Sequence, residues 1–234
     1  MTSKDVVLIT GASKGLGRAI ARELARRGHP LIINARGASE LREAEEELSK
    51  FTRVVAIAGD VSEIAEEIAA RGLAEFGNID ILINNASDIG PTPMPPLESL
   101  EWSALLRLFK VNAVAPLHLI QLVLPRMRVR GRGTIINISS DAGVNAYAGW
   151  GGYGASKAAL DLLSRVLAVE LEGTGVRVHV VDPGDMNTEM HRLAVGSTAL
   201  SHLPDPSSVA PRILELLEPS GATDSQPVEL AVLT

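Results

Sequence analysis

"VVLITGASKGLGRAIARELARRG", residues 6–28, contains the signals that decide the fold of this chain. A short run of apolar and β-branched residues, 6–10, stops at Gly11 and predicts a buried strand. Leu16, Ile20 and Leu24 then recur at helical spacing up to Gly28, a residue type that often follows a helix end. A strand, a glycine-rich turn and a helix in this order predict the first unit of an α/β fold.

The same alternation continues along the rest of the chain. Apolar runs predict strands at 31–35, 53–58, 79–86, 133–140, 176–184 and 227–233. Helical patterns cover 39–50, 60–76, 98–128, 153–171 and 207–218, and the segment before the last helix has no clear pattern. Continuous apolar strands that alternate with helices predict a doubly wound parallel sheet of about seven strands, with helices on both faces. Because no Pro- or Ser-rich linker and no internal repeat divides the sequence, we expect a single domain over residues 1–234.

Composition narrows the class of protein. Hydrophobic residues make up 46% and charged residues 21%, which is typical of a globular protein rather than a disordered one. A net charge of −6 argues against a nucleic-acid surface. Four arginines between 126 and 132 lie where a long helix should end, and we interpret them as a solvated helix end rather than a binding patch.

The absence of cysteine excludes disulfides, thiolate metal sites and cysteine nucleophiles, and suits a reducing compartment. The histidines show no metal-ligand spacing, so no metal site is expected. The N-terminus becomes glycine-rich too early for a signal peptide, and no uncharged apolar run reaches membrane-spanning length. We therefore expect a cytoplasmic protein without a membrane or nucleic-acid partner.

The turn "TGASKGLG", residues 10–17, predicts a phosphate site. Gly11, Gly15 and Gly17 allow a tight turn with outward backbone N–H groups, and the next helix points its positive N-terminus at the same place. The spacing is G-x-x-x-G-x-G rather than the common G-x-G-x-x-G, and such a turn alone is a weak signal. Its place between the first strand and first helix favours a dinucleotide pyrophosphate over a plain turn.

Two basic residues occur in the segments where a cofactor ribose would lie. Sites selective for NAD often place an acidic residue after the second strand, but "LIINARG", 31–37, has Arg36 and no carboxylate. Lys14 lies inside the glycine turn. Because guanidinium groups bind phosphate in a bidentate way, we favour NADP(H) over NAD(H). The alternative is that Arg36 is only a loop residue and Lys14 only a surface charge.

These motifs resemble a family. The chain looks like a classical short-chain dehydrogenase/reductase, with "TGASKGLG" as the cofactor turn, "NNA" at 84–86 and "VN" at 111–112. The resemblance continues through "NISS" at 137–140, "YGASK" at 153–157 and "DPG" at 182–184 followed by Thr188. Two departures stand out. Ser87 occupies a position where the family usually has glycine, and the chain after residue 190 lacks the familiar glycine-rich ending.

The resemblance implies a single-domain Rossmann fold and a set of site residues. Asn112, Ser140, Tyr153 and Lys157 would be catalytic; Ser140 is chosen over Ser139 because it lies thirteen residues before the tyrosine. Asp60 would contact the adenine edge, and Thr188 the nicotinamide carboxamide. The cofactor residues implied are Gly11, Ser13, Lys14, Gly15, Leu16, Gly17, Arg36, Asp60, Val61, Asn84, Ala86, Val111, Tyr153, Lys157, Pro183, Gly184 and Thr188.

The Tyr153–Lys157 pair suits proton transfer. An unperturbed phenol has a pKa near 10, and a nearby ammonium favours the phenolate and lowers that pKa. Residues four apart on a helix share a face, so Lys157 can lie beside Tyr153. Ser140 can donate a hydrogen bond to a substrate oxygen. The resemblance implies that Asn112 holds a water that connects Lys157 to solvent.

Loops at 87–97, 141–152 and 185–203 should surround the substrate, with a lid at about 185–206. They offer a mostly apolar wall, so a neutral or hydrophobic carbonyl compound fits better than a polyanion. These side chains could equally be packing or subunit contacts. They are Met94, Asn145, Tyr147, Trp150, Met186, Met190 and His191.

The sequence therefore predicts an NADP(H)-dependent oxidoreductase for a carbonyl/alcohol pair, working as a reductase. A cofactor-binding regulatory or scaffold protein without turnover is the alternative, and such proteins commonly lose the tyrosine or lysine that this chain retains. A third possibility is that the same fold catalyses another reaction, such as epimerisation, and no feature of the sequence distinguishes this from reduction. The resemblance also implies a homodimer or homotetramer paired through the 98–128 helix and the helix that starts at Tyr153.

Overall fold

The computed structural model describes residues 4–195, 200, 202–217 and 230–232. Parts of the predicted lid (196–199 and 201), of the predicted helix 207–218 and of the last predicted strand lie outside the described residues. The single domain over residues 1–234 stays a prediction.

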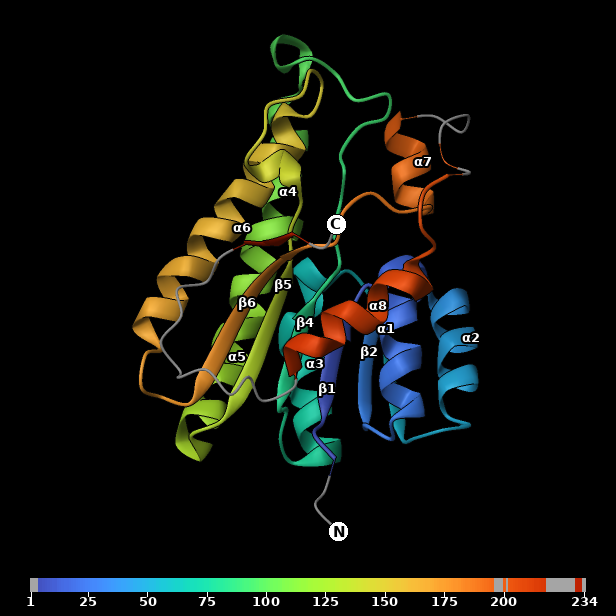
Figure 1. The fold of residues 1–234 in the computed structure, drawn as a ribbon, viewed down its shortest axis with the longest axis vertical. Helices are drawn as coiled ribbons and strands as arrows, with labels where there is room; N and C mark the ends of the chain where they lie inside the picture. The colour runs from blue at the N-terminus through green and yellow to red at the C-terminus, as the bar shows by residue number, and fades with distance from the viewer. Residues whose placement is uncertain (1–3, 196–199, 201, 218–229, 233–234) are drawn as a thin grey trace.

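The described strands form one sheet of seven parallel strands in the order β3-β2-β1-β4-β5-β6-β7. Helices cover both faces of this sheet, so the doubly wound Rossmann-like fold predicted from the sequence is confirmed (Figure 1). The strands are β1 Val7–Thr10, β2 Leu31–Ala35, β3 Val54–Ala58, β4 Ile81–Asn84, β5 Gly133–Ile138, β6 Val176–Asp182 and β7 Leu230–Val232.

Most predicted helices are present with small shifts in their bounds. The described α-helices are α1 Gly15–Arg26, α2 Ala38–Leu48, α3 Val61–Phe76, α4 Trp102–Phe109, α5 Ala115–Arg130, α6 Gly151–Glu170, α7 Glu189–Val195 and α8 Pro206–Leu214. Short 3-10 turns lie at 97–99, 141–143 and 215–217.

The predicted 98–128 helix differs most from the structure. It begins at Trp102 rather than near 98, because residues 97–99 form a separate 3-10 turn. A π-helical segment, Lys110–Val114, joins α4 to α5 and shifts the register of the faces by one residue. The segment that had no helical pattern in the sequence contains α7.

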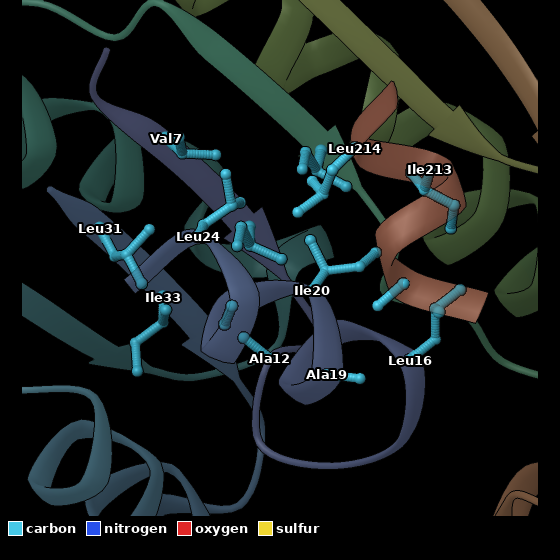
Figure 2. Close-up of a cluster of buried hydrophobic side chains, with 14 of the residues drawn as sticks. Val7, Ala12, Leu16, Ala19, Ile20, Leu24, Leu31, Ile33, Ile213 and Leu214 are labelled. Atoms are coloured by element: carbon cyan, nitrogen blue, oxygen red, sulfur yellow. The ribbon is translucent and has the colours of Figure 1, made fainter. Parts of the chain in front are cut away.

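Alternating side chains of the strands divide the core into two layers. Val7 and Ile9 face α1, α2 and α8, whereas Leu8 faces α3 and α5. Figure 2 shows the first layer, where Leu16 and Ile20 of α1 meet Ile213 and Leu214 of α8. This layer packs α8 against α1, the helix that follows the glycine turn. The core therefore fixes the position of that turn.

One helical stretch, Trp102–Arg130, is long and apolar enough to cross a membrane, and half of its most apolar window is buried inside the protein. Its α5 part packs Leu119, Ile120 and Val123 into the second core layer beside α3. That packing makes it a core helix.

The strand order reverses beside β1. The chain passes from β1 to β2 and β3 on one side, and then returns to β4 on the other side. Loops after β1 and β4 therefore leave the sheet in opposite directions and leave a crevice between them. In open α/β sheets, ligands bind at such a point, beyond the carboxyl ends of the strands.

His179 on β6 makes folding stability depend on pH. Burial, with a smaller contribution from Arg177, lowers the pKa of His179 to about 4, and its Nε2 has no hydrogen-bond partner among the described residues. Between pH 6.5 and 4 the unfolded chain binds a proton that the folded chain does not, so stability falls as pH decreases through this window. We expect wild type to lose about 2 kcal/mol more than His179→Gln between pH 7 and pH 5.

Urea unfolding of both proteins at the two pH values measures this difference. The exposed His202 supplies the control variant His202→Gln, which should follow wild type. Equal pH dependence in wild type and His179→Gln would contradict the prediction.

Candidate active site

A cavity of about 1120 Å³ lies over the carboxyl ends of the strands. Its wall begins at the glycine turn, crosses the end of the sheet and reaches α7. Most of the predicted cofactor residues line it: Gly11, Ser13, Lys14, Gly15, Leu16, Arg36, Asp60, Val61, Ala86, Val111, Tyr153, Lys157, Pro183, Gly184 and Thr188.

The glycine turn is shaped by contacts that leave no room for a side chain. Gly11 and Gly15 have φ angles of +67° and +56°, in the left-handed region that favours glycine. A Cβ on Gly11 would lie 2.8 Å from Asn85 Nδ2, and one on Gly17 would lie 2.4 Å from Gly11 O. No side chain among the described residues caps the start of α1. The first N–H groups of α1 are therefore available to an anion in the cavity.

The end of the cavity beside β2 contains Arg36, which is exposed just after that strand. The ammonium of Lys14 is 2.5 Å from the Glu189 carboxylate of α7, so this ion pair joins the glycine turn to the described part of the predicted lid. Asp60 has two structural partners. Its Oδ1 accepts from the backbone N–H of Ser62 and caps α3, and its Oδ2 lies 3.5 Å from Arg107.

Three predicted site residues do not line the cavity. Gly17 is packed under the turn against Gly11. Asn84 is 3% exposed and donates to Asn137 Oδ1 inside the sheet, because neighbouring strand residues point to opposite faces. Asn84 therefore lies outside the cavity wall and its neighbour Asn85 reaches the cavity, while the cofactor contact of Asn84 stays a prediction. The third, Asn112, is buried behind the wall.

Tyr153 and Lys157 come from the first turns of α6, one helical turn apart. Tyr153 is 8% exposed and packs edge-to-face against Trp150, with ring centroids 5.7 Å apart. Lys157 is 2% exposed; its ammonium donates to Ile138 O at 2.8 Å and lies 5.6 Å from the centre of the Tyr153 ring. The helix therefore brings the pair together at one end of the cavity.

Burial dominates the ionisation of both groups. It raises the pKa of Tyr153 to about 12, and the nearby hydroxyls of Ser140 and Ser87 act in the opposite direction. This differs from the lowered pKa expected from the sequence, because desolvation of the phenolate outweighs its neighbours. Burial also lowers the pKa of Lys157 to about 8, opposed by the charge of Asp161. At neutral pH Tyr153 is therefore a phenol, and Lys157 carries its positive charge in most molecules.

The structure separates the two adjacent serines as the sequence predicted. Ser139 is buried and its hydroxyl donates to the Asp161 carboxylate, away from the cavity. Ser140 lines the cavity, where its Oγ accepts from Ala142 N and donates to Asp141 Oδ1. Ser140 is thus the less buried of the two serines, and it lies in the cavity wall beside Asp141 and Ala142.

The Asn112 side chain makes four hydrogen bonds. Its Oδ1 accepts from Asp88 N at 2.8 Å and from Ser87 Oγ at 3.1 Å. Its Nδ2 donates to Asp88 O and to Ser156 Oγ. The carboxamide therefore anchors the loop after β4 to α6, directly behind Tyr153.

The far end of the cavity has apolar and aromatic walls that also carry charge. Five of the predicted substrate residues line it: Tyr147, Trp150, Met186, Met190 and His191. Met94 and Asn145 do not, and Met94 instead packs on the cluster of Ile89, Ala142 and Tyr153. Two carboxylates that the sequence reasoning missed, Asp141 and Asp185, also form this end. Asp141 accepts a 2.6 Å hydrogen bond from the Tyr147 hydroxyl, and Asp185 lies 3.6 Å from His191.

No group of three or more His, Cys, Asp or Glu side chains that could hold a metal ion occurs in the part of the chain that the structure describes.

Comparison with known proteins agrees with this geometry. A family model described as short chain dehydrogenase matches residues 5–196. The NADP-dependent 3-hydroxy acid dehydrogenase YdfG of Escherichia coli K12 is 36% identical over 180 residues, covering 76% of this chain and 71% of that protein. The glycine betaine reductase ATRR of Emericella nidulans is 32% identical over 226 residues, which cover 95% of this chain but only 17% of ATRR.

Among solved structures, a metagenomic short-chain oxidoreductase in complex with NADP has a TM-score of 0.82 and 32% identity, with 99% of this chain and 98% of that chain covered. Short-chain dehydrogenases are oxidoreductases that bind a nicotinamide cofactor and act on small molecules. The family match covers the glycine turn, the strand ends and the Tyr153–Lys157 helix together. The chain belongs to the short-chain dehydrogenase family.

Proposed function

We propose that this chain is an NADPH-dependent reductase of carbonyl compounds. The observation that carries the proposal is the shared cavity: Tyr153 and Ser140 lie at one end, and the uncapped start of α1 with Arg36 lies at the other. The names of YdfG and of the metagenomic NADP complex support the choice of cofactor, although they describe those proteins.

The residues present fit a dinucleotide. The Cβ-free turn at Gly11 and Gly17 allows close approach, and the free N–H groups of α1 suit a pyrophosphate. Arg36 gives a guanidinium for a 2′-phosphate. A bound nicotinamide cofactor would supply the hydride for reduction of the substrate carbon.

The chain's own residues would supply the proton and hold the substrate. Tyr153, a phenol at neutral pH, donates its proton to the substrate oxygen. Ser140 hydrogen-bonds the same oxygen as charge develops on it. The Lys157 ammonium lies behind the tyrosine ring and favours the phenolate that proton donation leaves. Asn112 holds the loop after β4 against α6. The water that the resemblance places between Asn112, Lys157 and solvent stays a prediction.

The charge of the cavity favours a neutral or cationic substrate. Asp141, Asp182 and Asp185 line the substrate end, where the cations are the buried Lys157 and Arg192, whose guanidinium donates to Asn187. A carboxylate on the substrate would meet these like charges in a partly desolvated place. The proposal therefore departs from the acid substrate that the name of YdfG specifies for that protein.

The homodimer or homotetramer stays a proposal, and exposed apolar side chains support it. Leu162, Val166 and Val169 form an exposed face of α6, and Trp102 and Leu106 are exposed on α4. These are the helices through which the sequence predicts pairing. The cytoplasmic location also stays a prediction.

Tyr153→Phe tests the proposed reaction. We expect NADPH oxidation against a panel of ketones, aldehydes, quinones and 3-oxoacyl thioesters to fall by about 10²- to 10⁴-fold, because the proton donor is lost. NADPH binding, measured by fluorescence titration, should stay within about threefold of wild type because the ring remains. Binding of NADPH without any turnover in wild type would instead favour the alternative of a regulatory or scaffold protein.

Arg36→Asp tests the cofactor preference. Loss of a charge-assisted phosphate contact, plus repulsion, should raise the Kd for NADPH by about 10- to 100-fold. The Kd for NADH should change by less than about threefold, since no phosphate meets residue 36 in that case. Arg42→Asp, an equal charge change on the exposed side of α2, is the control. Equal weakening of both cofactors by Arg36→Asp would remove the case for the 2′-phosphate.

Asp185→Asn tests the charge of the substrate end. Removal of an exposed carboxylate should raise kcat/KM for carboxylate-bearing ketones by about threefold and leave neutral ketones nearly unchanged. Glu172→Gln, remote from the cavity, controls for net charge. Steady-state kinetics at low ionic strength measure both ratios, and an equal change for neutral and anionic substrates would contradict the proposed charge preference.

A further inference from the structure

The Arg107 side chain joins two carboxylates of the cavity wall that come from different loops. Its Nε donates to Asp88 Oδ2 at 2.9 Å, and its Nη2 lies 3.5 Å from Asp60 Oδ2. Asp60 follows β3 and Asp88 follows β4, and both line the cavity, whereas Arg107 stands behind them on α4. A guanidinium carries several N–H donors in a planar fork, so a single arginine can serve both carboxylates at once.

The two loops that Arg107 joins flank the part of the wall assigned to the cofactor phosphates. In the sheet, β2 and β1 lie between β3 and β4. Arg36 follows β2, and the glycine turn follows β1. A dinucleotide held by these two groups would therefore have the Asp60 loop on one side and the Asp88 loop on the other.

Asp88 is held by two residues of one helical stretch. Its backbone N–H and C=O bond the Asn112 side chain at 2.8 Å each, and its carboxylate accepts from Arg107. In a regular α-helix, residues five apart point about 140° away from each other. The π-helical segment, Lys110–Val114, begins between Arg107 and Asn112, and its wider turn lets both side chains reach the same loop.

The burial of the two carboxylates makes their counter-charge important. The side chains of Asp60 and Asp88 are 22% and 16% exposed, whereas that of Arg107 is 52% exposed. An exposed ion pair contributes little to the free energy of folding. A mostly buried carboxylate, however, is screened less by solvent, so its charge acts more strongly on an anion in the same cavity. Without Arg107, both carboxylates would face the phosphates of the cofactor.

We propose that Arg107 is a positioning residue for the cofactor, which holds the Asp60 and Asp88 carboxylates in place and offsets their charge so that a dinucleotide can lie between them. This inference rests on the proposed function, because it takes the occupant of the cavity to be NADP(H). Arg107 acts through the two carboxylates, since it stands outside the cavity lining. It touches neither Tyr153 nor Ser140 in the described structure, so it sets the affinity for the cofactor and not the rate of proton transfer.

Arg107→Met tests this role, because it removes the guanidinium and keeps an apolar stem of similar length. We expect the Kd for NADPH, measured by fluorescence titration, to rise by about tenfold through repulsion between the freed carboxylates and the phosphates. The value of kcat at saturating NADPH should stay within about twofold of wild type, because Asn112 still holds Asp88. Salt screens such repulsion, so the ratio of the two Kd values should approach one at about 0.5 M salt.

Lys110→Met is the matched control. Lys110 belongs to the same helical stretch, is 48% exposed and pairs with Glu63, which stands outside the cavity wall. This variant loses the same charge and should bind NADPH as wild type does. Equal increases in Kd for Lys110→Met and Arg107→Met would show an effect of net charge alone and overturn the proposal. A Kd for Arg107→Met that matches wild type would overturn it too.

A double-mutant cycle separates an effect through the carboxylates from a merely structural one. In the background Asp60→Asn/Asp88→Asn, adding Arg107→Met should change the Kd for NADPH by less than about twofold, because no charge remains to be offset. Arg107→Lys, which keeps the charge, should recover most of the affinity in the native background. A tenfold loss that persists in the Asn background would contradict the proposed role of Arg107.

Failure of this inference is distinguishable from failure of the proposed function. The titrations measure binding and need no turnover, so NADPH binding without reduction of any carbonyl compound contradicts the reductase and leaves the test of Arg107 intact. Turnover that depends on Tyr153, together with an unchanged Kd in Arg107→Met, contradicts the role of Arg107 alone.

Discussion

The hydrogen bonds of Thr10 at the end of β1 hold the two halves of the site together. Its buried hydroxyl oxygen accepts from the backbone N–H groups of Asn85 and Ala86, at 3.1 and 3.0 Å. Asn85 in turn donates from Nδ2 to Thr10 O and Gly11 O. These bonds lie where the strand order reverses and no regular ladder can join the diverging loops. The glycine turn and the loop that carries Ser87 therefore have a fixed relative position.

Burial of the proton-transfer residues sets the resting state of the site. It moves the pKa of Tyr153 up to about 12 and that of Lys157 down to about 8. A proton therefore stays on the phenol at neutral pH, which suits a donor in the reducing direction. Burial also makes the phenolate of Tyr153 unfavourable. The Lys157 charge and the hydroxyls of Ser140 and Ser87 make that phenolate less unfavourable. The apolar walls and the polar groups around Tyr153 therefore set its pKa together.

The sequence predicts secondary structure best where one property dominates a segment. The strand predicted at 31–35 has the same bounds as β2, because all five residues are buried and four of them are apolar. Helix α7 was missed because it buries no residue completely and so shows no apolar stripe. Asn84 was chosen over Asn85 because a motif does not say which of two adjacent side chains faces the cavity. The pKa of Tyr153 was given the wrong direction because the neighbouring charge is visible in the sequence, whereas desolvation is a property of the fold.

The cavity is one space with opposite electrostatic ends, and this polarity constrains what it can hold. At the glycine turn, uncapped N–H groups of α1 and the Arg36 guanidinium favour anions. At the other end, Asp141, Asp182 and Asp185 disfavour them. A dinucleotide with its pyrophosphate at the first end would keep its phosphates there, because the carboxylates near Tyr153 repel them. The proposed cofactor would thus be oriented by charge, and the substrate would be selected by what the acidic and aromatic walls of the second end accept.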